Sequence, residues 1–463
     1  MFKLMLWQFR YSWRKWVGTL FVFTAAGVAL GFTFIGLFSA INIYMGNGGP
    51  SAGIIFTMPG SFGVITIILI INGVTRLLIN SFSKDYRLWG VLGANPNQLS
   101  MLVSGQMTLL SLIGAIFGYF LSYPIVSSFY SWMLTTPGSN GMPAIPMHLS
   151  LQSFMLTILF VGVLTAIASF FDSRRIFVKK QKHFFKFKKL RGSGMSPIRY
   201  LFSFASLAGL IYLYSIFFQK PLKAQKIFSS KGLPLVDTYT KAFLLYTIVA
   251  IVTFSLLAPL FLPFIIRLLF KFVPHNWLKT FTTAYYNVLS KKDFLNSVVV
   301  PLFTFSFFAS YFTYMTLDLE SVNVKARLAG IMGTAIFMFG EPFLVIFANI
   351  ISITIISSPQ RNESVGQLQL LGFSFTDLLG EKSLEAMLYA GVIFVSGVIN
   401  NAFLFSTIIK AAQNTAVTAK SNWLSITYWP MIAGITAFLF IVIIDIAHIY
   451  RVSTENEIPE VAE

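Results

Sequence analysis

Ten apolar stretches, each long enough to cross a lipid bilayer, constrain this chain more than any other feature. They lie near residues 17–40, 60–82, 101–123, 152–171, 200–218, 242–266, 296–316, 330–356, 385–408 and 427–449. A helix needs about 20 apolar residues to cross the hydrocarbon core. Hydrophobic residues make up 56% of the chain and charged residues only 11%. We therefore predict an all-α integral membrane protein with ten transmembrane helices.

The distribution of Lys and Arg predicts the orientation of these spans. An even number of spans places both termini on one side, and if that side is the cytoplasm, cytoplasmic segments hold 24 of the 34 basic residues. External loops then hold nine, and Arg76 lies inside a span. Because basic residues collect on the cytoplasmic side, we expect a multi-pass plasma-membrane protein with both termini inside.

Residues 219–241 oppose this orientation, because a loop predicted to be external carries five lysines and a single acid, Asp237. Either this loop meets anionic headgroups or wall polymers outside, or the fifth span is placed wrongly. The densest basic run, with ten Lys and Arg between Ser173 and Arg199, is expected to lie against anionic lipid of the inner leaflet. Nucleic acid is the less favoured partner, since Phe residues interrupt the run between two spans.

A short pattern occurs twice at the same spacing and indicates an internal duplication. It consists of a glycine, a polar or acidic residue 13 positions later and a second glycine 12 positions further on. The first occurrence is Gly93, Gln106 and Gly118, and the second is Gly372, Glu385 and Gly397, so one constant offset relates all three pairs. A repeat of this length predicts two related helix bundles.

The duplication divides the chain into two four-helix units joined by a central helix pair. The predicted segments are 1–172 (first unit), 173–199 (basic cytoplasmic linker), 200–275 (central pair), 276–450 (second unit) and 451–463 (acidic cytoplasmic tail, expected to be disordered). No external loop is predicted to exceed about 30 residues, too few for an ordinary folded domain. Substrate handling is therefore expected inside the membrane.

A cytoplasmic helix is predicted between the second and third spans. It runs from Lys84 through an apolar stretch to Gly93 and stops at Asn95 and Pro96. A helix that cannot bury its apolar stripe alone is typical of a docking element, with an ordinary surface loop as the alternative. Docking is favoured because the pattern partly recurs, as Arg361, Glu363, Leu368, Leu371 and Gly372.

These motifs resemble those of the FtsX-like permease family, the MacB-type branch of ABC transporter membrane subunits. In the first copy the matching residues are Asp85, Leu92, Gly93, Ala94 and Gly118, with Gln106 in place of the family's acid. In the second copy they are Glu363, Leu371, Gly372, Glu385 and Gly397, with Phe373 in place of Ala94 and one extra residue before Gly372.

The resemblance implies that both segments are coupling helices that dock onto ATP-binding subunits. The implied coupling residues are Asp85, Arg87, Leu92, Gly93, Asn95, Glu363, Leu371 and Gly372. Two docking sites in one chain imply two copies of the ATPase. The chain contains no Gly-Lys dipeptide and hence no phosphate-binding loop, so ATP-Mg is expected in the partner, with no cofactor and no catalysis here.

The sequence also argues against thiol and metal chemistry. The chain has no cysteine, and its four histidines lack the spacing of metal ligands.

Ionisable residues within apolar spans mark candidate functional positions, because charge in the membrane is costly. Glu341 lies in the sequence FGEPF, where Gly340 and Pro342 are expected to break the helix. The preferred interpretation is a structural glutamate that is protonated or paired; the alternative is a site that changes between transport states. Glu385 is a second intramembrane candidate. Arg76 and Asp445 are expected near the cytoplasmic interface, where snorkelling or simple pairing explains them.

The predicted function is that of a permease subunit that couples ATP hydrolysis by a separate subunit to export or extraction of an amphipathic, peptide or lipid-like substrate. Two alternatives remain from other classes: a secondary transporter that uses Glu341, and a signalling or mechanotransmitting membrane protein that moves no substrate. An intramembrane enzyme has the least support, because no catalytic constellation is evident.

Cysteine labelling tests the orientation, since the natural chain has no cysteine that would interfere. We expect an impermeant thiol reagent to label Ser139→Cys and Asn414→Cys from outside intact cells. It should not label Ser193→Cys in the basic linker, and reaction there would overturn the orientation. Labelling of Ser229→Cys would place the lysine-rich loop outside.

Overall fold

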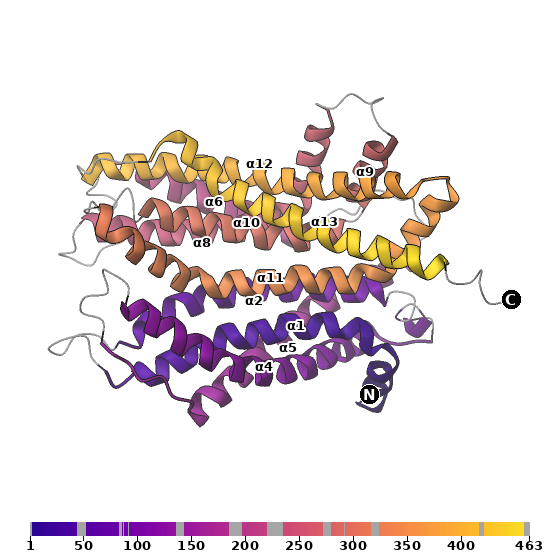
Figure 1. The fold of residues 1–463 in the computed structure, drawn as a ribbon, viewed down its shortest axis with the longest axis horizontal. Coiled ribbons are helices and arrows are strands. Elements are labelled where there is room, and N and C mark those ends of the chain that lie inside the picture. The colour runs from indigo at the N-terminus through magenta and orange to yellow at the C-terminus, as the bar shows by residue number, and fades with distance from the viewer. Residues whose placement is uncertain are drawn as a thin grey trace. The chain divides into compact units, whose positions relative to one another are not determined.

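The computed structural model describes residues 2–43, 52–82, 86, 88–90, 92–135, 143–184, 197–219, 235–271, 279–290, 292–315, 324–415 and 421–457. In these ranges every regular element is a helix, which confirms the all-α class (Figure 1). Nine helices of the described part are long and apolar enough to cross a membrane. The tenth predicted span falls in α11 (Val324–Leu370), whose apolar segment Gly340–Ile353 is shorter.

The helices pack into two compact units. The first comprises Met1–Lys189, Lys325–Ser374 and His448–Glu463, and the second Leu190–Val324 and Phe375–Ala447. Besides α11, the first unit contains α1 (Phe2–Ala40), α2 (Ile54–Ser81), α4 (Pro96–Thr135) and α5 (Leu151–Phe184). The second contains α6 (Pro197–Phe217), α8 (Leu235–Lys271), α9 (Lys279–Ser290), α10 (Lys292–Tyr314), α12 (Phe375–Thr415), the 3-10 turn η2 (Trp423–Thr427) and most of α13 (Tyr428–Glu457).

Helix α11 packs with α1 and α2, although the repeat assigns it to the second four-helix set. The ring of Phe337 lies 5.8 Å from that of Phe32 and 5.4 Å from that of Phe56. Near the other end of α1, a Cβ atom at Gly18 would lie 3.0 Å from the carbonyl oxygen of Ser352. The boundaries 1–172 and 276–450 follow sequence similarity and stay a prediction, whereas α11 is a fifth helix of the first packing unit.

Small residues bring α1 and α4 into backbone contact. Each helix carries two glycines one turn apart, Gly27 and Gly31 on α1 and Gly114 and Gly118 on α4. A Cβ atom at Gly27 would lie 2.7 Å from Cα of Ala115, and one at Gly118 would lie 2.7 Å from Cα of Gly27. Lipid tails are as apolar as side chains, so such close packing, rather than hydrophobic burial, holds membrane helices together.

The corresponding positions meet in the second unit as well. At the offset that relates Gly118 to Gly397 on α12, Gly27 corresponds to Ser306 on α10. A Cβ atom at Gly397 would lie 3.4 Å from Oγ of Ser306. The repeat therefore preserves a packing contact as well as a spacing.

One turn further along, the second unit adds hydrogen bonds to this contact. Gly31 and Ser122 correspond to Ser310 and Asn401. The Nδ2 group of Asn401 donates to Oγ of Ser310 at 2.7 Å and to the carbonyl of Ile426 at 3.0 Å. Polar side chains thus link α10, α12 and η2 at the repeat positions where small residues link α1 and α4.

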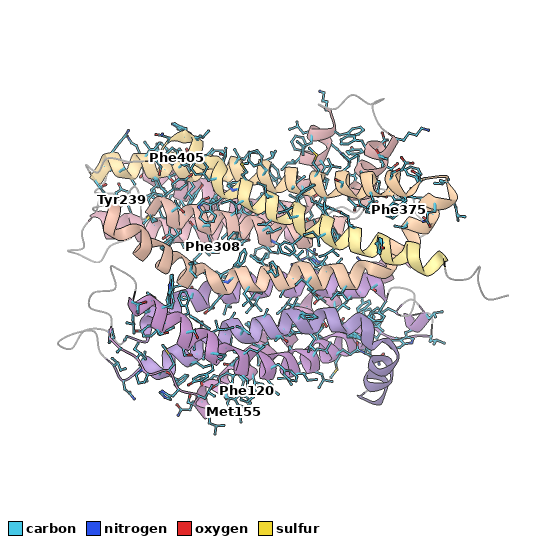
Figure 2. The ribbon with its side chains drawn as sticks, viewed as in Figure 1. Phe120, Met155, Tyr239, Phe308, Phe375 and Phe405 are labelled. Atoms are coloured by element: carbon cyan, nitrogen blue, oxygen red, sulfur yellow. The ribbon has the colours of Figure 1, made fainter. Side chains whose placement is uncertain are left out.

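The outer faces of α4 and α5 carry exposed apolar side chains, as expected of surfaces that meet lipid. Phe120 on α4 and Met155 on α5 point away from the helix bundle (Figure 2). On α4, these outward residues alternate with the buried glycine face. The helix therefore presents one face to protein and the other to lipid.

The polar connections differ in part from the predictions. The tail from residue 451 was expected to be disordered, but α13 continues to Glu457, because extending an existing helix needs no new nucleus. Helix α5 likewise runs into the basic linker as far as Phe184. Ser139, Ser193 and Ser229 lie outside the described residues, whereas Asn414 ends α12 and donates to the Tyr239 hydroxyl at 2.9 Å.

Substitution at Gly118 tests the contact between α1 and α4. We expect Gly118→Ala to lower the midpoint of thermal unfolding in detergent, by an overpacking cost of about 1–3 kcal/mol. Gly209→Ala on α6 is the matched control, since a Cβ atom there meets nothing within 4 Å. Equal midpoints for the two variants would show that the close approach does not contribute to stability.

Candidate functional site

A left-handed glycine closes the helical turn after α2. Gly93 has φ +92°, a conformation that glycine adopts without steric cost. The Ala94 amide donates to the Trp89 carbonyl at 2.9 Å, and the Gly93 amide donates to the Gly90 carbonyl at 3.2 Å. This pair of bonds is the Schellman arrangement, which satisfies the last carbonyls of a helix. The predicted glycine stop is confirmed.

The same turn ends α11. Gly372 has φ +84°, the Phe373 amide donates to the Leu368 carbonyl at 3.1 Å, and the Gly372 amide donates to the Gln369 carbonyl at 2.9 Å. The offset from Gly93 to Gly372 also relates every other donor and acceptor of this turn to its counterpart in the first. The repeat therefore preserves the backbone geometry of both turns, although Phe373 replaces Ala94.

Asn95 starts the next helix, α4, and fixes the direction in which the chain leaves the first turn. Its Oδ1 accepts a 3.4 Å bond from the Asn97 amide, and its own amide donates to Oε1 of Gln98 at 3.1 Å. Pro96 occupies the first helical position, where its missing N–H costs nothing. Asn95 thus acts locally as an N-cap in a reciprocal capping arrangement.

Each turn exposes two leucines. The exposed fractions are 63% for Leu88, 84% for Leu92, 90% for Leu370 and 75% for Leu371. Both turns lie at the end of the first unit where α1 begins (Figure 1), which is the predicted cytoplasmic end. Paired exposed leucines beyond the apolar spans are typical of a surface that another protein covers.

Aromatic contacts attach the first turn to the helices of its unit. Tyr86 is buried, and its ring lies 5.3 Å from that of Phe177 on α5. Phe82, at the end of α2, stacks on Trp16 of α1 at 5.4 Å. In the second turn Leu368 is the buried anchor. These contacts attach the two turns to α1, α2, α5 and α11.

The structure describes most of the predicted coupling residues. Asp85 and Arg87 lie outside the described residues, and for Glu363 only the helical backbone is described. The residues that the structure places in the two turns are Leu92, Gly93, Asn95, Leu371 and Gly372.

Arg76 forms a bidentate ion pair with Asp172, and this pair joins α2 to α5. The distances are 3.0 Å from Nε to Oδ2 and 3.0 Å from Nη2 to Oδ1. Simple pairing of Arg76 is therefore confirmed, in the geometry that gives Arg–carboxylate pairs their strength. The sequence pattern gave no sign of Asp172 as the partner, because the two residues lie on different helices 96 positions apart.

Glu385 belongs to a buried network of charges near the start of α12. Lys382 Nζ lies 2.8 Å from Oε2 of Glu385 and 3.0 Å from Oε2 of Glu381. The Tyr389 hydroxyl donates to Glu385 at 3.3 Å, and Nδ2 of Asn287 on α9 donates to Glu381 at 2.6 Å. The network thus fixes α12 to the amphipathic helix α9.

Asp445 on α13 also contributes to the electrostatic field at Lys382. In the first copy, the positions equivalent to Glu381, Lys382 and Glu385 hold Leu102, Val103 and Gln106, so this network belongs to the second copy alone. The repeat pointed to Glu385 but not to its neighbours. Glu381 and Lys382 could have been recognised from the sequence, because both are charged and lie within about one helical turn of Glu385.

Glu341 is buried between α1, α2 and α11, with 6% of its surface exposed. The Thr33 hydroxyl donates to Oε1 at 2.8 Å. Among the described residues, Oε2 has no hydrogen-bond partner, and a Cβ atom at Gly63 would lie 2.8 Å from it. A buried polar atom without a partner costs about 1–3 kcal/mol.

The expected break in α11 is absent. The helix continues through Gly340 and Pro342, which corrects the prediction from the FGEPF sequence. A proline removes only one N–H from the helical ladder, and neighbouring helices tolerate this in membrane bundles. Glu341 is therefore a side chain on a continuous helix, in which Pro342 removes a single backbone donor.

Comparison with known families supports the resemblance. Residues 57–180 match the model of a family described as FtsX-like permease C-terminal. The chain carries an FtsX-like permease domain. The matched segment includes the first turn, the Arg76–Asp172 pair and the glycine face of α4. Comparison with curated proteins gives no significant match.

The FtsX-like domain supports a membrane permease of the ABC-transporter type. Members of this family are generally non-catalytic membrane subunits.

Removing Lys382 tests the buried network. We expect Lys382→Met to lower the free energy of unfolding by about 3–5 kcal/mol, because two buried carboxylates lose their cation. Chemical unfolding in detergent measures this loss. Lys410→Met is the matched control on the same helix, since the Lys410 ammonium is exposed and donates to the neutral Gln413 amide at 3.3 Å. Equal losses in both variants would contradict a stabilising role for the network.

Proposed function

We propose that the chain is the membrane-spanning permease subunit of an ABC transporter. It couples ATP hydrolysis by a separate ATPase subunit to export or extraction of an amphipathic, peptide or lipid-like substrate. One observation carries this proposal: two turns of matching backbone geometry, one in each copy of the repeat, each present a pair of exposed leucines. ATP-Mg binds in the partner, because the chain has no phosphate-binding loop.

The exposed leucines supply the contact with the ATPase. Burying one leucine side chain contributes about 1.5–3 kcal/mol, so each turn offers a small hydrophobic anchor. The left-handed glycines end the helices abruptly and leave the leucines at the tip. Two turns correspond to two copies of the ATPase, one for each turn.

Both turns act on the same packing unit. The first turn follows α2, the second ends α11, and both helices pack with α1 in the first unit. Closure of an ATPase pair would move the two turns relative to each other. Because Tyr86, Phe82 and Leu368 are buried anchors, this movement passes into α2 and α11 and changes their contact inside the membrane.

A secondary transporter is the second candidate, and the buried carboxyl of Glu341 is the observation in its favour. Its energy would enter through an ion or proton at Glu341. Transport that needs a proton gradient and no ATPase would select it. A signalling protein would bind the ATPase yet move no substrate.

Substitution of the exposed leucines tests the docking surface. We expect Leu92→Asp and Leu371→Asp each to weaken ATPase binding by about 3 kcal/mol, roughly 100-fold, because an apolar contact becomes a buried unpaired charge. Copurification of the ATPase subunit with the tagged permease measures the effect. Membrane insertion should be unchanged, since both side chains lie outside the apolar spans.

Leu151→Asp is the matched control for this experiment. Leu151 is also strongly exposed but begins α5, at the end of the first unit opposite to the two turns. An acid is tolerated at a helix N-terminus, so ATPase binding should be retained. Full copurification with both Leu92→Asp and Leu371→Asp would refute the docking assignment.

A further inference from the structure

Four phenylalanine rings from four helices form an aromatic cluster in the first unit. The cluster consists of Phe32 on α1, Phe56 on α2, Phe129 on α4 and Phe337 on α11. Phe337 contacts all three other rings, with centroid distances of 5.4–6.1 Å, and Phe32 lies 6.1 Å from both Phe56 and Phe129. Phe32, Phe56 and Phe337 are buried.

The aromatic cluster and the Glu341 carboxyl lie within one helical turn of each other along α1 and α11. Phe32 adjoins Thr33 in the sequence, and Phe337 precedes Glu341 by one helical turn. Thr33 lies seven residues before Ala40, the external end of the apolar part of α1. At 1.5 Å per residue, the carboxyl is about 10 Å below that end. With the predicted orientation, the site lies in the outer half of the membrane.

The hydrogen bonds of Glu341 are incomplete in this arrangement. Thr33 satisfies Oε1, whereas Oε2 faces Gly63 and has no hydrogen-bond partner among the described residues. An ionised carboxylate therefore lacks a donor at Oε2. The structural interpretation of Glu341 allows a protonated or a paired side chain. The incomplete pairing of Oε2 suits the alternative, a group that gains its partner in another state.

The chemistry of the surroundings defines that partner. A carboxylate within a helical turn of an aromatic cluster is a combination that attracts organic ammonium groups, through charge and cation–π interaction. Hard metal ions require six or more oxygen ligands, and the described surroundings provide one carboxylate and one hydroxyl. An anionic group would be repelled. The aromatic faces also suit the alkyl groups attached to an ammonium nitrogen.

We propose that Glu341, Thr33 and the aromatic cluster form a binding site for the ammonium group of an amphipathic substrate in the outer half of the membrane. This inference rests on the proposed permease function and specifies its substrate class. The site is closed in this structure, because α2 meets Glu341 at Gly63. Separation of α2 from α11, the helices that lead into the two turns, would admit the ammonium group.

Photolabelling tests the site directly. The probe is a diazirine-bearing dodecyltrimethylammonium, and the protein is in phosphatidylglycerol nanodiscs with its ATPase subunit and ATP, so that all states are sampled. We expect saturable labelling of peptides that contain Thr33, Gly63 or Glu341. Glu341→Gln keeps the shape and removes the charge, and should reduce this labelling at least 10-fold. Phe56→Leu should reduce it several-fold.

Two controls separate the site from general effects. Phe303→Leu removes a ring from the second unit, where the ring centroids of Phe303 and Phe254 are 3.6 Å apart. This variant should leave the labelling unchanged. In the unaltered protein, unlabelled dodecyltrimethylammonium should compete, whereas dodecyl sulfate and dodecyl maltoside should not. The competition requires no substitution, so it holds even where a variant fails to fold.

Undiminished labelling in a stable Glu341→Gln protein, or equal competition by the sulfate and maltoside, would overturn the inference. Absence of labelling in every peptide of the site would also overturn the inference. Loss of the site with intact ATPase copurification would leave the proposed function standing. Failure of the Leu92 and Leu371 experiment would instead refute ATPase docking, whatever the labelling shows.

Discussion

Close backbone contact at small residues is the constraint on which this fold depends. Within lipid, an apolar side chain gains little by leaving the bilayer for another helix, so packing distance decides which helices associate. Gly27 and Gly118 bring α1 and α4 to a separation at which neither position admits a Cβ atom. The equivalent pair, Ser306 and Gly397, keeps the contact in the second unit. The repeated glycine spacing in the sequence reflects this structure. In each copy the first glycine, Gly93 or Gly372, ends a helix. The second, Gly118 or Gly397, lies against a neighbouring helix.

The position of α11 brings both proposed docking turns to one packing unit. The helix comes from the second half of the chain, yet Phe337 and Glu341 pack against Phe32, Thr33 and Gly63 of the first unit. In this packing the contact between α2 and α11 is also the contact between the two elements that carry the turns. A force applied at Gly93 and Gly372 would reach the membrane at the aromatic cluster and Glu341, without a separate relay.

The sequence predicted the features that depend on local chemistry, and the structure supplied those that depend on packing. The helical class, the glycine stop before Asn95 and the relation of the two turns followed from apolar length, residue type and spacing. The partner of Arg76 could not be predicted, because 96 positions separate it from Asp172. The packing of α11 in the first unit could not be predicted either. A sequence repeat shows which segments are related, but it does not show which helices pack together. The FGEPF sequence misled because proline weakens a helix without ending it where adjacent helices support the backbone.

The two copies have diverged in their polar chemistry, and this divergence bears on mechanism. The second copy carries Glu381, Lys382 and Glu385 where the first has two apolar residues and a glutamine, so the start of α12 is held to α9 by buried charges. A buried ion pair adds little net stability over an apolar core but is costly to break, so this network restrains the start of α12. The start of α4, in contrast, relies on the neutral cap of Asn95 and Gln98. Equal forces on the two turns would thus meet a more rigid base after Gly372 than after Gly93. The α2 side, which approaches Glu341 closely at Gly63, is then the side expected to move away from it.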